Sequence, residues 1–227
     1  MPVFRHRLVL IAALALAAVL PSPAEAKSDT QYWQTLHLSW KVSDRVVLTN
    51  DTVMRTSDAR GRYQIANHFL VAYKLDKHWS VAIGHTADLQ YNHSSYTTME
   101  NRFRQDVAYD GLFTFGKAKV SGRLRLEERW RDGFGGTGWR LRPYVKLAVP
   151  LSEKLTLNLS HEDFVDLNTT GFQKISGLER MRNSLILDVP LNKHFGLGFG
   201  YVEQHGFVPG ADDTDDHVAS VLVNASF

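Results

Sequence analysis

The chain has 227 residues, a formal net charge of +2 and no cysteine. Its near balance of 26 basic and 24 acidic residues argues against nucleic acid as a partner. This length predicts one domain, and the sequence has no Pro-, Ser- or Gly-rich linker that would divide it.

Residues 1–26 have the layout of a secretory signal peptide. Two arginines near the start precede an apolar run over residues 8–20, and residues 24–26, Ala-Glu-Ala, form a small-x-small cleavage site. The apolar run is shorter than the roughly 18 residues expected of a membrane-spanning helix. We therefore predict Sec-type export with removal of this segment, so that residues 27–227 form the mature domain.

Apolar and polar side chains alternate along most of the remaining chain, which predicts β-strands because successive side chains of a strand point to opposite faces. Eleven strands are predicted, over residues 31–42, 45–56, 62–75, 78–91, 99–115, 117–131, 138–151, 154–167, 177–190, 194–206 and 215–227. Tight turns alternate with longer connections over residues 57–61, 92–98, 132–137, 168–176 and 207–214. This asymmetry is typical of outer-membrane barrels, which have short periplasmic turns and longer external loops.

The central hairpin, residues 99–131, shows the alternation most clearly. Charged residues occupy one parity, and apolar residues, many of them aromatic, occupy the other. A soluble β-sandwich would bury its apolar face, whereas a barrel in a lipid bilayer turns its apolar face outward and its polar face inward. We therefore predict an all-β fold: a single antiparallel transmembrane β-barrel of 10 to 12 strands with a charged interior.

Extending this parity to the neighbouring strands predicts a lumen charge network. Its members are Glu100, Arg102, Arg104, Asp106, Arg123, Arg125, Glu127, Arg129, Arg140, Arg142, Glu162, Arg180 and Arg182. Arginine suits such an interior because its planar guanidinium binds carboxylates through two hydrogen bonds, whereas an unpaired buried charge is costly. Two roles stay open: a structural interior whose charges are paired, or a narrow channel in which surplus arginine selects small acidic or sugar-like solutes.

The strand count conflicts with the even number that is typical of bacterial single-chain barrels. It also puts the start of strand 31–42 at the external end when the chain is traced back from a periplasmic C-terminus. Either one strand has been merged with another, which gives twelve, or residues 31–42 are not a full wall strand, which gives ten.

The last predicted strand, 215–227, has Val221, Val223 and Phe227 on one parity and ends on the aromatic residue. Such an ending resembles the signal that outer-membrane proteins present to the barrel-assembly machinery. We therefore predict Phe227 as an assembly signal. The predicted location is the outer membrane of a Gram-negative bacterium, where lipid and lipopolysaccharide would be neighbours, and the oligomeric state stays open.

Several short phrases run through the mature chain: Trp33-Gln-Thr, Glu100-Asn101-Arg102, Arg123-Leu-Arg125-Leu-Glu127, Arg140-Leu-Arg142-Pro-Tyr144, His161-Glu162-Asp-Phe164 and Glu179-Arg180-Met-Arg182. Together they resemble an uncharacterised bacterial family of outer-membrane barrels, named domain of unknown function 2490. The resemblance implies a β-barrel in the outer membrane and brings no activity, substrate or catalytic residue.

The sequence predicts no enzyme, cofactor or metal site. Ser160 and His161 are neighbours on a strand and point to opposite faces, so they cannot pair as nucleophile and base. The acidic run 212–217 lacks the glycine-bearing loop and distal glutamate of an EF-hand, and a solvated loop is expected. Two other classes stay open: a lipid-active enzyme, with a serine and a histidine converging near the outer rim, and a surface-binding barrel that uses loops 92–98, 168–176 and 207–214.

Overall fold

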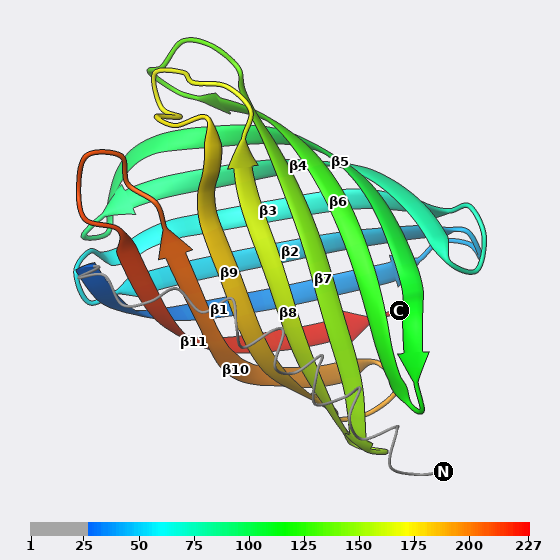
Figure 1. Cartoon of the computed structure of the whole chain (residues 1–227). Coiled ribbons are helices and arrows are strands. Elements are labelled where there is room, and N and C mark those ends of the chain that lie inside the picture. Colours follow the sequence, from blue (N-terminus) through cyan, green and yellow to red (C-terminus); the bar gives the residue numbers. More distant parts are fainter. Residues whose placement is uncertain (1–26) are drawn as a thin grey trace, which may run out of the picture.

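In the computed structural model, residues 27–227 form one closed barrel of eleven β-strands (Figure 1). The strands are β1 (Lys27–Lys41), β2 (Val46–Ser57), β3 (Gly61–Lys74), β4 (Trp79–Asn92), β5 (Ser95–Phe115), β6 (Ala118–Arg131), β7 (Gly138–Ser152), β8 (Leu155–Asp166), β9 (Gly177–Pro190), β10 (Phe195–Gly206) and β11 (Thr214–Ser226). Each predicted strand is present, with ends that differ by four residues or fewer. The predicted signal peptide, residues 1–26, lies outside the described residues.

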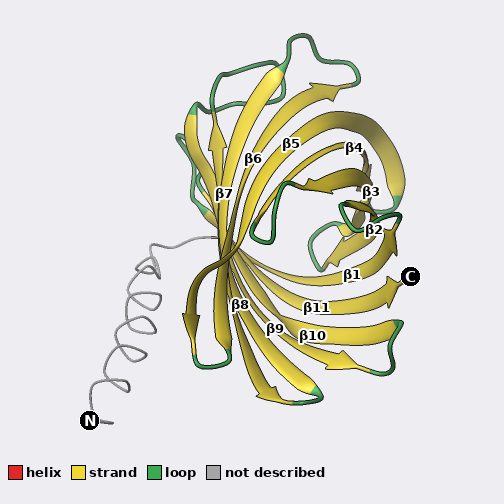
Figure 2. Cartoon of the chain, turned by 90° about the vertical axis from the view of Figure 1, so that its right-hand side faces the viewer, coloured by secondary structure: helices red, strands yellow, loops and turns green. Residues whose placement is uncertain are grey.

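Every regular element of residues 27–227 is a strand, as Figure 2 shows, so the all-β prediction is confirmed. Across these residues the chain forms no helix whose length and hydropathy would suit a membrane crossing.

The barrel closes through an unexpected pairing. Each strand is antiparallel to the next one in the chain, but β1 and β11 pair in parallel over Lys27–Ser39 and Thr214–Ser226. An odd number of up-and-down strands brings the first and last strands together in the same direction. The count of eleven is therefore correct, and both ways of reaching an even number, ten or twelve, are wrong.

The tight turns gather at one end of the barrel and the longer loops at the other (Figure 1). Two tight turns are built alike. Asp76 Oδ1 accepts the backbone N–H groups of His78 and Trp79, both at 2.7 Å, and Asn192 does the same for the residues two and three positions on. These hydrogen bonds, from Trp79 first and then His78, lower the pKa of Asp76.

The predicted long connection 92–98 is wrong. β4 and β5 continue to a two-residue turn, His93-Ser94, in which both residues have positive φ angles of 47° and 67°. Two successive residues with positive φ make the turn type that matches the twist of a hairpin. The backbone N–H of His93 donates to Arg60 of the β2–β3 connection, so this hairpin is held against its neighbour.

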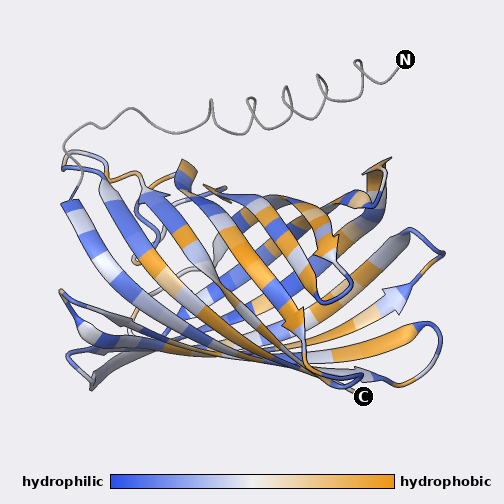
Figure 3. Ribbon diagram, turned by 90° about the horizontal axis from the view of Figure 1, so that it is seen from below, coloured by the Kyte–Doolittle hydropathy of each residue, from blue (hydrophilic) through white to orange (hydrophobic). Residues whose placement is uncertain are grey.

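The two faces of the wall differ as predicted. Hydrophobic and hydrophilic residues alternate along many of the strands (Figure 3). Large aromatic side chains are at least 36% exposed on the outside, among them Trp79, Phe103, Phe115, Trp130, Trp139, Phe195 and Tyr201. Inside, the largest fully buried side chains include Glu100 and Glu127. Full burial of carboxylates together with exposure of large apolar side chains is the reverse of a soluble protein.

A small apolar cluster inside the barrel supports the parallel pairing of β1 with β11, which we call the parallel seam. Trp33 of β1, Val202 of β10 and Val218 of β11 are each 5% exposed or less, and Ile186 of β9 packs against them. Gly200 makes room for this packing, because a Cβ atom there would lie 2.5 Å from Cδ1 of Ile186 and 2.0 Å from the carbonyl oxygen of Leu185.

Candidate functional site

The inward faces of β4–β9 carry a dense set of charges. All thirteen residues predicted for the lumen charge network lie on inward positions, and each takes part in at least one ion pair. The register explains several of these pairs, because it sets Asp106 opposite Arg125 and Glu162 opposite Arg182.

Glu100 is the hub nearest the long-loop end. Its carboxylate accepts hydrogen bonds from Arg102 at 2.6 Å, Arg129 at 2.9 Å and Arg131 at 2.5 Å. Arg102 also bonds Asp88 of β4, whose oxygens accept from Gln64 as well. One buried carboxylate therefore neutralises only part of the charge of three guanidinium groups.

The middle of the network is tied across four strands. Arg125 of β6 binds Asp106 of β5 through two hydrogen bonds of 2.7 Å each. Arg142 of β7 joins Glu127 of β6 at 2.7 Å to Glu162 of β8 at 2.8 Å. These arginine forks bridge neighbouring strands, so they stiffen the wall as well as satisfy the buried carboxylates.

Arginine outnumbers its partners, so like charges also face one another. The register sets Arg125 opposite Arg142 and Arg102 opposite Arg129. Aromatic rings relieve part of the repulsion, since the guanidinium of Arg142 lies 4.3 Å from the ring centre of Phe164. The interior therefore combines paired charge with surplus positive charge.

Six members of this interior are absent from the predicted network: Arg55, Asp88, Arg131, Asp166, Gln173 and Glu179. Arg55 of β2 stacks on Trp33 at 3.8 Å and forms no ion pair with any described residue. Extending the alternation to strand 45–56 would have placed it inward. Glu179 binds Arg140 at 3.2 Å next to an irregularity in the β8–β9 register, which has no sequence signal.

Two adjoining cavities occupy the lumen. The outer one, of about 790 Å³, lies at the long-loop end, where residues such as Lys27, Arg60 and Phe207 line it. The inner one, of about 210 Å³, is lined by nine arginines from β2, β5, β6, β7 and β9 but by only one carboxylate, Asp51. Arg55 belongs to both linings, so the two cavities are neighbours.

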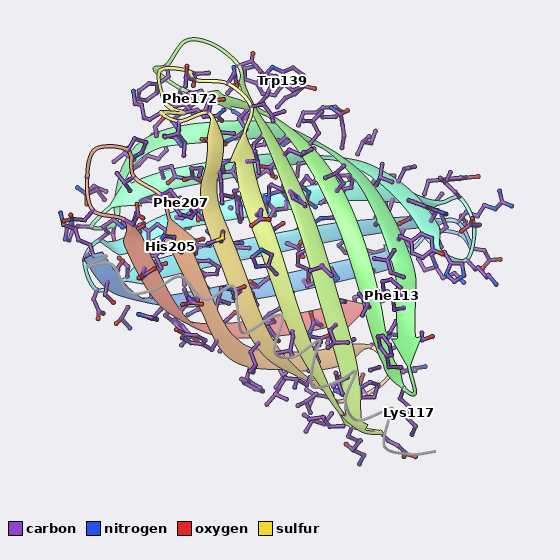
Figure 4. The ribbon with its side chains drawn as sticks, in the orientation of Figure 1. Phe113, Lys117, Trp139, Phe172, His205 and Phe207 are labelled. Atoms are coloured by element: carbon purple, nitrogen blue, oxygen red, sulfur yellow. The ribbon has the colours of Figure 1, made fainter. Side chains whose placement is uncertain are left out.

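The connection between β8 and β9 contributes to the lining of the outer cavity. Phe172 and Gln173 are 9% and 2% exposed, although they belong to a loop. Arg129 donates to Gln173 Oε1 at 2.8 Å, and Gln173 Nε2 donates to the carbonyl of Asn168 at 2.6 Å. Figure 4 shows Phe172 at the same end as Trp139 and Phe207, opposite Phe113 and Lys117.

His161 and His68 are held in ordinary hydrogen bonds. His161 faces outward and bonds Asn183 at 2.8 Å and Asp163 at 3.0 Å, while Ser160 lies on the opposite parity. His68, in the lumen, bonds Thr86 at 2.9 Å. Within residues 27–227, no group of three or more His, Cys, Asp or Glu side chains has the arrangement of a metal site.

Comparison with known proteins gives a family but no activity. A family model described as "Protein of unknown function (DUF2490)" matches residues 30–215. An uncharacterised protein of Methylorubrum extorquens strain AM1 is 26% identical over 222 residues, an alignment that covers 96% of each chain. No solved structure matches the chain.

Proposed function

Since the chain belongs to the DUF2490 family, which brings neither substrate nor reaction, we propose its role from the barrel itself: a non-enzymatic outer-membrane β-barrel with a narrow, anion-selective lumen. The observation that carries this proposal is the inner cavity, whose lining contains nine arginines and one carboxylate, Asp51. The charge that lines a pore and the radius of the pore decide which ions pass. A surplus of arginine favours small acidic or sugar-like solutes.

The membrane location rests on the distribution of side chains over the wall. Large apolar side chains are exposed outside, among them Ile83 at 57% and Phe113 at 63%, while charged residues are buried inside. Lipid would cover this outer surface, and a closed barrel leaves no unpaired strand edge in it. We propose export through the Sec route and insertion by the barrel-assembly machinery with Phe227 as its signal, next to lipid and lipopolysaccharide.

A planar bilayer experiment tests the pathway. The folded protein is inserted, and single-channel current and reversal potential are recorded in a salt gradient. Discrete steps with a reversal potential set by the anion are expected. Arg55→Gln should reduce the anion preference, because Arg55 lines both cavities, whereas Arg62→Gln should leave it unchanged, because Arg62 lines neither. Cation preference in the wild-type protein would contradict the proposal.

A closed, ion-paired barrel is the second candidate. The observation in its favour is the β8–β9 connection, whose residues Phe172 and Gln173 are buried in the lining of the outer cavity, where Gln173 accepts a hydrogen bond from Arg129. Silence of well-inserted protein at all voltages would support this candidate and reject the channel.

A further inference from the structure

Beyond general selectivity, the inner cavity has the features of a binding site. We infer that it holds one small oxyanion that carries two or more negative charges, such as a phosphate or a dicarboxylate. The inference rests on the proposed function, since it names the solute class and the position at which that solute would stop.

The first argument is the number of unused donors. The Nε–H groups of five lining arginines are buried and have no hydrogen-bond acceptor within residues 27–227: Arg55, Arg123, Arg142, Arg180 and Arg182. Arg142 is only 7% exposed. Buried donors normally find acceptors, and a charged donor loses more than a neutral one when it does not. Oxyanion oxygens are suitable acceptors for them.

The second argument is the imbalance of charge. Arg55 has no carboxylate partner in the described residues, and Arg182 reaches Glu162 only at 3.7 Å. Glu162 is already shared with Arg123 and Arg142. These arginines come from different strands and surround one space, so a ligand with a single charge would leave part of the excess uncompensated.

The third argument is size and geometry. A cavity of about 210 Å³ is several times the roughly 30 Å³ that one water molecule occupies in the liquid. A planar guanidinium can bind phosphate or carboxylate through two parallel hydrogen bonds, which a halide ion cannot accept in the same way. The site therefore discriminates by shape as well as by charge.

Isothermal titration of the purified, folded barrel in detergent tests the site, with inorganic phosphate and succinate as probes and chloride as the comparison. One saturable site for phosphate or succinate, with weaker binding of chloride, is expected. Arg55→Gln should weaken that binding by about tenfold or more, since a hydrogen bond to a charged group is lost. Arg62→Gln is the matched control, because Arg62 also has an unpartnered Nε but lies outside both cavities.

A second variant guards against a folding defect. Arg104→Gln leaves Glu127 paired with Arg142, and its folding is checked by heat-modified gel mobility before titration. Absence of saturable binding to the wild-type protein, or equal losses in Arg55→Gln and Arg62→Gln, would overturn the site. Saturable binding in a protein that carries no current keeps the site and rejects the channel, whereas anion-selective current without saturable binding does the reverse.

Discussion

Arg125 shows how each buried arginine depends on the carboxylate beside it. Asp106 and Arg125 are 8% and 7% exposed and share two hydrogen bonds of 2.7 Å. Arg125→Ala leaves a buried carboxylate without its partner, which costs about 3–5 kcal/mol. The loss should appear as a lower urea midpoint of unfolding and as altered heat-modified gel mobility.

Two controls distinguish the loss of the Asp106–Arg125 ion pair from the general effect of removing one positive charge. The double variant Arg125→Ala with Asp106→Ala should lose less stability than the single variant, because no unpaired charge stays behind. Arg45→Ala removes an exposed arginine that hydrogen-bonds Tyr73 at the barrel rim, and its midpoint should stay near the wild-type value. A wild-type midpoint for Arg125→Ala would contradict the prediction.

Gly200 is a position at which the addition of a Cβ atom should lower the stability of the barrel. A Cβ atom there would lie 2.0 Å from the carbonyl oxygen of Leu185, whereas a Cβ atom at Gly196 on the same strand would lie 3.4 Å from its closest neighbour. Gly200→Ala should therefore destabilise the barrel by about 1–3 kcal/mol through overpacking, and Gly196→Ala should change it little. Urea midpoints measure both, and equal midpoints would show that the backbone moves apart without cost.

At the scale of the element, the β3–β4 turn has a predictable pH dependence. Hydrogen bonds from Trp79 and His78 lower the folded-state pKa of Asp76, so their contribution is present above the unfolded pKa of about 4 and is lost as the pH falls through the folded pKa. Asp76→Asn should remove that dependence. Hydrogen exchange of the Trp79 amide, followed against pH in both proteins, measures it.

Asn192 provides the reciprocal test in the equivalent turn. Its amide oxygen already accepts the N–H groups of His194 and Phe195, without an ionisable group. Asn192→Asp should introduce the pH dependence that Asp76→Asn removes. Identical exchange profiles for Asn192→Asp and the wild-type protein would argue that the turn is held by its flanking strands instead.

The β8–β9 connection is an element whose position depends on one side chain. Gln173 receives a hydrogen bond from Arg129 and donates to three oxygens of the loop and β7. Gln173→Ala should free the loop, increase its cleavage by protease and raise the single-channel current. Lys174→Ala is the matched control, because Lys174 is exposed and donates only to Gly171. Equal cleavage of the two variants would contradict this role.

The alternation of polar and apolar residues predicted the strands well, because one face of each strand is polar and the other is apolar. A shift of the strand register by one residue would turn every side chain of that strand to the wrong face. It failed where the backbone departs from regular alternation. Polar residues in 92–98 suggested a long loop, but two residues with positive φ close the hairpin there. Glu179 enters the network beside a register shift, which no pattern of side chains encodes.

For the whole molecule, the proposed orientation can be checked on intact cells. The chain has no cysteine, so a single introduced thiol can be labelled selectively. Gly135→Cys lies in a long loop and should react with a membrane-impermeant maleimide, whereas Lys193→Cys lies in a tight turn and should react only after the outer membrane is permeabilised. Reaction of Lys193→Cys alone on intact cells would reverse the orientation.

The way in which the barrel closes, and the contacts that depend on this closure, could not be predicted from the sequence. The alternation counts strands but does not say which edges meet, so the parallel pairing of β1 with β11 was not foreseen. For the same reason, the surroundings of Trp33 could not be predicted. The guanidinium groups of Arg55 from β2 and Arg182 from β9 stack on the Trp33 ring, 3.8 Å and 4.8 Å from its centre. All three residues come together only when the barrel is closed.

The parallel seam also determines the order in which the strands can pair during folding. In a hairpin, pairing starts beside the turn and advances one residue after another, because each new pair encloses only slightly more chain. Along β1 and β11 every pair, from Lys27 with Thr214 to Ser39 with Ser226, is separated by the same 187 positions. The seam has no short starting point, so the first strand of the barrel must wait for the last one, and its edge stays open longest during assembly.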